Sequence, residues 1–357
     1  MPTEQGPAGL PPATLRALVA GLFQTRGLSA PSAGLATAAL VAADMGGKAS
    51  HGVMLVPMYL ERMEAGSVSL ADEAAVVHDA KTAVVLDAAN ALGQVSANQA
   101  CLLAASRARE YGLAMITVRN AFHFGEAGFW ARQMADAGCV GIAMSNTRPL
   151  MPAPGGSERC VGNNPLAIAM PHAGDIPVVL DMAMSASAMG KIRLARQEGR
   201  AIPEDWATDA RGVPTRDPAK AIQGLLLPCA GPKGFGLAFM IDLLCGGLSD
   251  GAIGDEVRPL YGPADTPYGC AQAFLAIDPE HFGLGRPLPD RAAGFARRVR
   301  ESRPATGGSR VCSPGERGWR STQDHQDWCP VSADVARQLA ALARISGISV
   351  PAEWQSL

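Results

Sequence analysis

Two histidines beside glycines are the residues of this chain best suited to chemistry. His51 lies in the string 49–53, Ala-Ser-His-Gly-Val, and His123 lies in the string 119–125, Arg-Asn-Ala-Phe-His-Phe-Gly. Imidazole titrates nearer neutrality than any other side chain, so a positioned histidine can donate or accept a proton at pH 7. Each falls at an expected border between elements, where a ring can face a cleft. From spacing alone, an ordinary half-buried or loop histidine remains the simpler interpretation of either.

Three other strings carry side chains that could bind a ligand or react. Asp181 ends an apolar strand, where a buried carboxylate needs hydrogen-bond donors, although a local turn would explain it equally well. The loop 231–236 carries Lys233 just before a helix and could bind a phosphate or carboxylate, or form a simple turn. The string 247–251 matches the Gly-x-Ser-x-Gly of serine hydrolases around Ser249. A helix precedes it where a hydrolase needs a strand, so we interpret it as a helix end.

The elements that must position these residues follow from apolar periodicity. Helices are expected over about 12–24 and 32–44, and a third carries apolar residues from Val53 to near Gly66. Ser50 is then a candidate N-cap of the third helix, and His51 stands at its positive end, where the helix dipole lowers the pKa of an imidazole. Further on, the sequence predicts strands at 74–77, 82–86, 113–118, 140–145, 166–170, 177–182 and 272–277, and helices at 94–110, 126–137, 187–199, 237–248, 289–302 and around 335–342. This order predicts an α/β centre flanked by helical segments from both chain ends.

Composition excludes several classes of protein. The 357 residues are 48% hydrophobic and 18% charged, with a net charge of −2 and no block of lysine and arginine, so no nucleic-acid partner is expected. No apolar run reaches the roughly 18–20 residues of a membrane helix, and no secretory signal is visible, so a cytoplasmic protein is expected. The eight cysteines include no Cys-x-x-Cys pair, which indicates reduced core thiols and no metal site.

Seven strings taken together resemble the type-2 malate/L-lactate dehydrogenase family. They occur in the family's order, at 50–53 followed by Tyr59, 120–125, 154–156, 162–165, 180–185, 233–237 and 314–316. Each string is weak alone, but seven in order are specific. Members of the family include ureidoglycolate dehydrogenase, 2,3-diketo-L-gulonate reductase, sulfolactate dehydrogenase, hydroxycarboxylate dehydrogenases and Δ1-piperideine-2-carboxylate reductase.

The resemblance implies a fold of its own kind. It is α/β, with a mixed, largely antiparallel sheet that binds NAD or NADP without the Rossmann glycines, and this chain contains no Gly-x-Gly-x-x-Gly. The resemblance also implies a homodimer with a small-molecule substrate. The expected domains are a helical one formed by 1–75 and 285–357, and an NAD(P)-binding one over 76–284.

Residue roles are likewise implied by the resemblance. His51 matches the histidine that gives a proton to the substrate carbonyl, and His123 matches a second active-site histidine. Ser50, Tyr59 and Asn120 fall in the strings expected to bind substrate. The expected cofactor contacts are Ser145, Asn146, Leu180, Asp181, Met182, Ala183, Met184, Ser185, Pro232, Lys233, Gly315 and Glu316.

The predicted reaction is hydride transfer between a nicotinamide and a 2-oxoacid or 2-hydroxyacid, with His51 favoured as the proton donor and acceptor. Leu55 stands where many members have an arginine suited to a substrate carboxylate, so an anionic substrate needs another cation. Arg148 and Arg193 are candidate partners for the phosphate of NADP, and the choice between NAD and NADP stays open.

Three alternatives remain at this point. The first is reduction of the C=N bond of a cyclic imine carboxylate, which needs the same proton donor. The second is hydrolysis through Ser249, and the third is a cofactor-binding protein that has lost catalysis.

Overall fold

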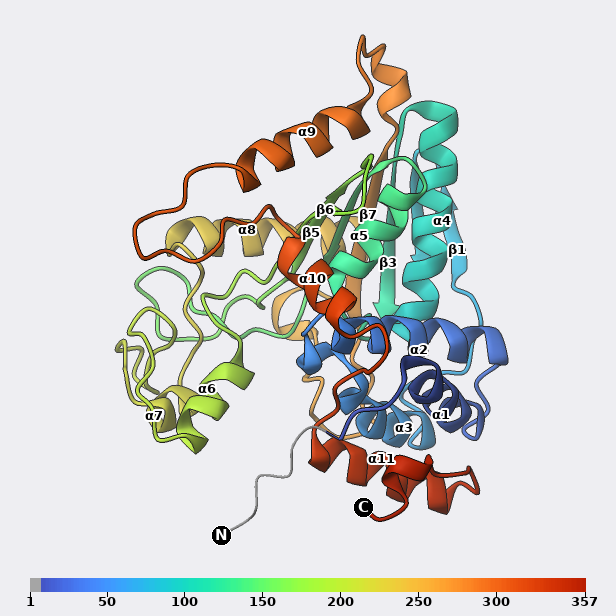
Figure 1. Cartoon of the computed structure of the whole chain (residues 1–357), viewed down its shortest axis with the longest axis vertical. Helices are drawn as coiled ribbons and strands as arrows, with labels where there is room; N and C mark the ends of the chain where they lie inside the picture. Colours follow the sequence, from blue (N-terminus) through green and yellow to red (C-terminus); the bar gives the residue numbers. More distant parts are fainter. Residues whose placement is uncertain (1–7) are drawn as a thin grey trace.

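One mixed sheet of seven strands forms the centre of the computed structural model, which describes residues 8–357 (Figure 1). The spatial order is β1-β2-β3-β7-β4-β5-β6. Only β2 and β3 pair in parallel, and the other neighbouring strands are antiparallel. The strands are β1 (Ala75–Asp79), β2 (Ala83–Asp87), β3 (Leu113–Ala121), β4 (Val140–Ser145), β5 (Leu166–Met170), β6 (Val178–Met182) and β7 (Cys270–Ile277). The mixed α/β architecture predicted from the sequence is confirmed.

Helices α4 (Gly93–Tyr111) and α5 (Ala127–Asp136) pack directly on the central strands. Close approach is possible because glycine stands at two contact points. A Cβ atom at Gly141 on β4 would lie 2.2 Å from the carbonyl oxygen of Ala131. A Cβ atom at Gly93, the first residue of α4, would lie 2.2 Å from the carbonyl oxygen of Phe122. The start of α4 therefore fixes the backbone immediately before His123.

The two ends of the chain meet in one helical layer beside the sheet (Figure 1). The amino-terminal part contributes α1 (Pro12–Gln24), α2 (Ala30–Met45) and α3 (Val56–Glu64), and the carboxyl-terminal part contributes α10 (Glu316–Asp324) and α11 (Ala333–Ile345). Helix α11 contacts α1 and α3, and α10 contacts α2. Helix α9 (Leu288–Arg300) instead lies against β6. The division into 1–75 with 285–357, and 76–284, stays a prediction, and residues 1–7 lie outside the described part.

The remaining helices are α6 (Met189–Gln197), α7 (Pro218–Gln223) and α8 (Pro232–Asp242). Helix α8 begins at Pro232, earlier than the predicted 237–248, and continues as a π-helical turn, η3 (Leu243–Gly247). Of its predicted apolar stripe, Ile241 is buried but Leu237, Met240 and Leu248 are exposed. In the described part of the chain, no helix is long and apolar enough to cross a bilayer.

Candidate active site

The two histidines predicted to do chemistry lie face to face. Their ring centroids are 5.9 Å apart and the ring planes are inclined by 30°. His51 ends a short 3-10 turn, η1 (Ala49–His51), that follows α2. His123 lies just beyond β3, after an irregularity in the pairing of β3 with β7. The helical layer and the sheet therefore each contribute one imidazole to the same place.

The local setting of His51 differs from the prediction. A second 3-10 turn, η2 (Val53–Leu55), follows η1, and α3 begins only at Val56 with a proline in its first turn. Ser50 is not an N-cap, because its hydroxyl lies 3.0 Å from Nδ1 of His51. The helix-dipole argument therefore does not apply. Burial lowers the pKa of His51, Asp181 acts in the opposite direction, and the charge of Lys48 lowers it further.

A buried carboxyl group supports the turn that carries His51. Asp44, near the end of α2, is 4% exposed and accepts a hydrogen bond of 2.7 Å from the N–H of Val53. A Cβ atom at Gly52 would lie 2.1 Å from the same carboxyl group, so only glycine fits there. Burial raises the pKa of Asp44 to about 7, against the effect of the Val53 hydrogen bond. Sequence reasoning missed Asp44, whose only signal was an acidic residue at the end of an alanine-rich helix.

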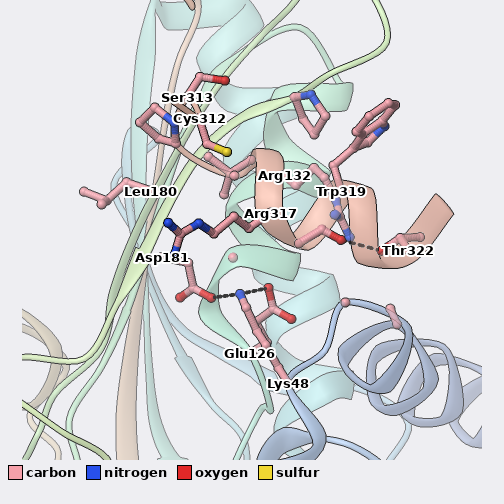
Figure 2. A pocket seen from close by; sticks show the side chains of 18 residues that line it. Lys48, Glu126, Arg132, Leu180, Asp181, Cys312, Ser313, Arg317, Trp319 and Thr322 are labelled. Carbon is pink, nitrogen blue, oxygen red and sulfur yellow. Dashed lines mark hydrogen bonds and ion pairs between the residues drawn. The ribbon is translucent and has the colours of Figure 1, made fainter. Parts of the chain in front are cut away.

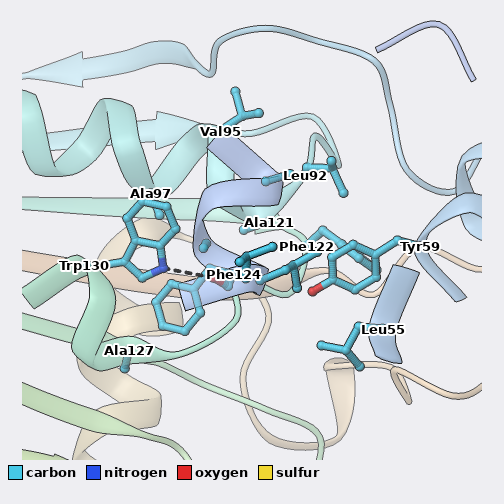
Figure 3. Packing of buried hydrophobic residues seen from close by; sticks show 14 of the residues in the cluster. Leu55, Tyr59, Leu92, Val95, Ala97, Ala121, Phe122, Phe124, Ala127 and Trp130 are labelled. Atoms are coloured by element: carbon cyan, nitrogen blue, oxygen red, sulfur yellow. Dashed lines mark hydrogen bonds between the residues drawn. The ribbon is translucent and has the colours of Figure 1, made fainter. Parts of the chain in front are cut away.

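His123 is half-buried and lies among aromatic residues, of which Figure 3 shows Tyr59, Phe122 and Phe124. The Tyr59 hydroxyl lies 2.6 Å from Nδ1 of His123, and the Tyr59 ring packs edge-on against Phe122 with centroids 5.0 Å apart. Burial raises the pKa of Tyr59, so its hydroxyl stays protonated and donates a hydrogen bond to Nδ1, which leaves the hydrogen of the neutral imidazole on Nε2. Burial, with a smaller effect of His51, lowers the pKa of His123 to about 3. The predicted binding residue Tyr59 thus fixes the tautomer of His123.

A lysine lies between two carboxylates (Figure 2), close enough to His51 for its charge to act on that imidazole. Nζ of Lys48 is 2.5 Å from Oε1 of Glu126 and 2.5 Å from Oδ2 of Asp181. Burial opposes the charge of Lys48, but the two carboxylates outweigh it and raise the pKa. Burial raises the pKa of Glu126, with Lys48 acting in the opposite direction. Lys48 and Glu126 were missed, although a cation three residues before His51 was a visible signal.

A cavity of about 520 Å³ extends from this cluster between β6 and α10. It is lined by the predicted cofactor positions Leu180, Asp181 and Gly315. Gly315 has φ +87°, and a Cβ atom there would meet the Val179 backbone at 3.0 Å, so glycine is required where the chain passes β6. Figure 2 shows Arg317 extending from α10 across this cavity. Two of the predicted cofactor segments, far apart in sequence, therefore line one cavity.

The side chain of Glu316 is buried at the start of α10. The buried carboxylate accepts hydrogen bonds from the N–H of Ser313 at 3.0 Å and from Arg320 at 2.7 Å. Burial acts to raise the pKa of Glu316, but these donors outweigh it and lower the pKa. This carboxylate holds the start of α10, and its predicted cofactor contact stays a prediction.

The chain that leaves β6 joins a third predicted cofactor segment. Met182 and Ala183 lead from Asp181 into a short extended run, where the N–H of Cys229 donates to the carbonyl oxygen of Met184 at 2.8 Å. Ser185 forms a bridge with Pro228, just before Pro232 and Lys233 at the start of α8. Within the described chain, the buried hydroxyl of Ser185 has no hydrogen-bond partner. The run 180–185 thus connects the cavity to the exposed cation of Lys233.

Three predicted contacts have side chains occupied elsewhere. Asn120 has φ +48° in the irregular part of β3, and its exposed amide donates to Asp87 at 3.0 Å. Asn146 is buried and its amide nitrogen donates to Asp242 at 2.9 Å. The hydroxyl of Ser145 donates to the carbonyl oxygen of Ala271 at 3.1 Å. The geometry does not bring these side chains into the histidine cluster, and their binding roles stay predictions.

Ser249 has no nucleophile geometry. It follows η3 and not a strand, it is 1% exposed, and its hydroxyl donates to the carbonyl oxygen of Gly246 at 3.1 Å. The interpretation of 247–251 as the end of a helical segment agrees with this placement.

The chain is similar to known dehydrogenases over nearly its whole length. The sequence model of the malate/L-lactate dehydrogenase family matches residues 10–340. L-sulfolactate dehydrogenase of Methanocaldococcus jannaschii is 31% identical over 96% of this chain and 98% of its own. Ureidoglycolate dehydrogenase (NAD(+)) of Escherichia coli is 34% identical over 85% of this chain and 86% of its own. (2R)-3-sulfolactate dehydrogenase (NADP(+)) of Chromohalobacter salexigens is 37% identical over 69% of this chain and 74% of its own.

Solved structures give the same result. The structure of the M. jannaschii sulfolactate dehydrogenase superposes with a TM-score of 0.90, covering 96% of this chain and 98% of the other at 31% identity. The Δ1-piperideine-2-carboxylate reductase of Pseudomonas syringae superposes with a TM-score of 0.84, covering 94% and 99% at 28% identity. The resemblance inferred from seven short strings is confirmed, and so is the predicted enzyme class, since the named relatives are dehydrogenases. This chain belongs to the malate/L-lactate dehydrogenase family.

Proposed function

We propose that this protein is an NAD(P)-dependent oxidoreductase that interconverts a 2-oxoacid and a 2-hydroxyacid, with His51 as proton donor and acceptor. The observation that carries the proposal is the stacked pair of His51 and His123, 5.9 Å apart. The pair lies beside Lys48 and Asp181, which line the cavity between β6 and α10. An imidazole pair beside residues that line a cavity suits a reacting carbonyl next to a bound cofactor.

Residues of the cavity, of the chain that leaves β6 and of the start of α8 fit a nicotinamide dinucleotide. The unpartnered hydroxyl of Ser185 is a buried polar atom that a ligand could satisfy. Lys233 at the start of α8 and Arg317 of α10 supply cations suited to phosphate groups. These residues would hold the cofactor, which supplies the hydride when bound.

The two histidines are suited to different tasks. His123 is held neutral by burial, with its Nδ1 occupied by Tyr59, so it can donate only through Nε2 and orients a substrate oxygen. Nδ1 of His51 contacts the exposed hydroxyl of Ser50, which can either donate or accept and so permits both ring forms, and Asp181 supports the protonated form. His51 therefore delivers a proton to the developing alkoxide in reduction and removes it in oxidation.

A second candidate reaction is the reduction of a cyclic C=N bond. It is favoured by the fold shared with the P. syringae Δ1-piperideine-2-carboxylate reductase, at a TM-score of 0.84. An imine must be protonated before it accepts hydride, and the same imidazole is placed to supply that proton.

A fluorescence titration with NADH and with NADPH, followed by a panel of 2-oxoacids and cyclic imine carboxylates, tests the proposal. Tight binding of one cofactor and its oxidation by one panel member is expected. The identity of that member distinguishes the two reactions. Binding of neither cofactor would refute the proposed function, and binding without turnover on the whole panel would favour a protein that has lost catalysis.

The proposal includes a homodimer. Support comes from the exposed apolar side chains of α8, of η3 and of the residue that follows η3, namely Leu237, Phe239, Met240, Leu243 and Leu248. Sedimentation equilibrium is expected to give about twice the chain mass of 36.9 kDa. A single-chain mass at micromolar concentration would exclude the dimer.

A further inference from the structure

An anionic substrate at the histidine pair requires a cation, and most of the nearby cations are already paired. Lys48 lies between the carboxylates of Glu126 and Asp181. Arg62 is 1% exposed and donates to backbone carbonyl groups, including those of Leu260 and Thr266. Neither can turn to a substrate without leaving buried partners unsatisfied.

Arg148 is placed differently by the topology of the sheet. Strands β3 and β4 are both antiparallel to β7, so they run in the same direction and end at the same edge of the sheet. His123 follows the end of β3 by two residues, and Arg148 follows the end of β4 by three. With neighbouring strands about 4.8 Å apart, the two loops lie about 10 Å from each other across β7.

Aromatic residues pack beside the two loops. Tyr268, just before β7, packs edge-on against Phe122 with ring centroids 6.0 Å apart. Tyr268 is buried, and its phenol is close enough to interact electrostatically with Arg148. The side chain of Arg148 is thus near the aromatic wall that also holds His123.

Arg148 has no anionic partner. Its side chain is half-buried, and among residues 8–357 its guanidinium has neither a hydrogen bond nor an ion pair. Burial and the like charges of Arg159 and Arg193 lower the pKa of Arg148. A guanidinium nevertheless remains charged in proteins. The unfavourable free energy of burying the charge of Arg148 is therefore offset only when an anion binds.

We propose that Arg148 binds the carboxylate of the substrate while the histidine pair binds the carbonyl or imine end. A guanidinium offers two parallel N–H donors, which match a carboxylate and fix its orientation. Arg148 then sets both the preference for an acid and the angle at which the reacting carbon meets the cofactor. The inference rests on the proposed function, because it assigns the other end of the same substrate.

The test measures three quantities in Arg148→Met and in the matched control Arg159→Met, which removes an exposed arginine of the same cluster. They are the KM and kcat for the best substrate of the panel, the Kd values of NADH and NADPH, and the calorimetric Kd of oxalate with cofactor bound. In Arg148→Met, KM and the oxalate Kd are expected to rise about 100-fold, with the cofactor Kd values unchanged. The KM and the oxalate Kd of Arg148→Lys should lie between those of wild type and Arg148→Met, because lysine keeps the positive charge but lacks the two parallel N–H donors of a guanidinium. Arg159→Met should change each value by less than about threefold.

The melting temperature separates this role from a structural one. Since Arg148 has no protein partner to lose, Arg148→Met should melt no lower than wild type in buffer without cofactor or oxalate. A clear drop in melting temperature would overturn the inference, and so would an unchanged KM. A weakened affinity for NADPH alone would overturn it in favour of a cofactor phosphate contact.

A failure of the proposed function can be distinguished from a failure of the Arg148 inference. If wild type turns over no panel member but binds oxalate in a manner that depends on Arg148, the proposed function fails and the anion site stands. If wild type neither turns over substrate nor binds oxalate, both fail.

Discussion

His51 and His123 are the same residue type in opposite surroundings. His51 lies on a short turn among ionisable groups, with Lys48 and Asp181 acting on its charge in opposite directions. His123 lies in an aromatic pocket, where Tyr59 occupies Nδ1 and burial keeps the ring neutral. The difference teaches that the group that cycles its proton needs charged neighbours, whereas the group that orients needs a fixed tautomer.

The largest expected effect comes from removing the cycling imidazole. His51→Asn should reduce kcat by about 10³-fold, because general acid catalysis contributes about 10² to 10⁴-fold, with the cofactor Kd preserved. Fluorescence titration and steady-state kinetics measure the two quantities. Near-normal turnover would remove His51 from the role and transfer it to His123.

The next effect concerns the carboxyl group beneath the His51 turn. With a pKa of about 7 against an ordinary 3.8, native Asp44 holds a proton that the unfolded chain has released between about pH 4 and pH 7. The free energy of unfolding therefore falls as pH rises through this interval, by up to about 4 kcal/mol. Asp44→Asn should remove this loss, keep an acceptor for Val53, and so be more stable than wild type at pH 8.

Urea unfolding at pH 5 and pH 8 checks the Asp44 prediction. The control is Asp72→Asn, because hydrogen bonds from Ser29 and Ser32 lower the pKa of Asp72 and make its contribution vanish as pH falls. A carboxyl group with a lowered pKa is ionised at both pH values, so Asp72→Asn should change the free energy of unfolding by the same amount at pH 5 and pH 8, whereas the effect of Asp44→Asn should differ between them. Equal free energies of unfolding for Asp44→Asn and wild type at pH 8 would contradict the prediction, because they would show that the ionised carboxylate of Asp44 does not destabilise the native state.

The variant Tyr59→Phe tests the proposed role of His123 as the imidazole that orients the substrate. The ring keeps its contact with Phe122, but Nδ1 of His123 loses its donor and both tautomers become accessible. A fall in kcat of about tenfold is expected, with the melting temperature nearly kept. A loss of the fold instead, seen in the near-ultraviolet circular dichroism, would show that the hydroxyl serves the core rather than the tautomer.

Much of the framework was predictable, because it depends on local patterns. Strand β4 occupies the predicted 140–145, and α1 occupies the predicted 12–24, since apolar periodicity reports one buried face. Both histidines were found from their glycine-bordered strings. The family resemblance added the segments 180–185 and 315–316, of which Leu180, Asp181 and Gly315 line one cavity, and periodicity alone could not relate these two segments.

The missed residues share a physical reason. Lys48 belongs to the site because it pairs with Glu126 and Asp181, which are 78 and 133 positions away in the sequence. The Ser50 cap was wrong because Pro57 begins α3 late, so the chain first forms two 3-10 turns. The hydrogen bond from the amide of Asn120 to Asp87, formed where β3 is irregular, was not foreseen either, and the substrate contact of Asn120 stays a prediction. Residue periodicity predicts regular helices and strands, but it predicts neither contacts between distant segments nor local irregularities.

The smallest expected effect is a shift of the pH profile in Lys48→Met, and it tests directly which of the two histidines titrates. Lys48→Met removes a charge that lowers the pKa of His51 and leaves Asp181 unpaired, so the pKa of His51 should rise. The alkaline limb of the pH profile for reduction should then move to higher pH, whereas Lys48→Arg should leave it in place. His123 faces no acid or base of this cluster and takes its low pKa from burial and from His51. A profile that moves with Lys48 therefore reports His51 as the titrating group, and one that does not move assigns the proton to a group outside the charged turn.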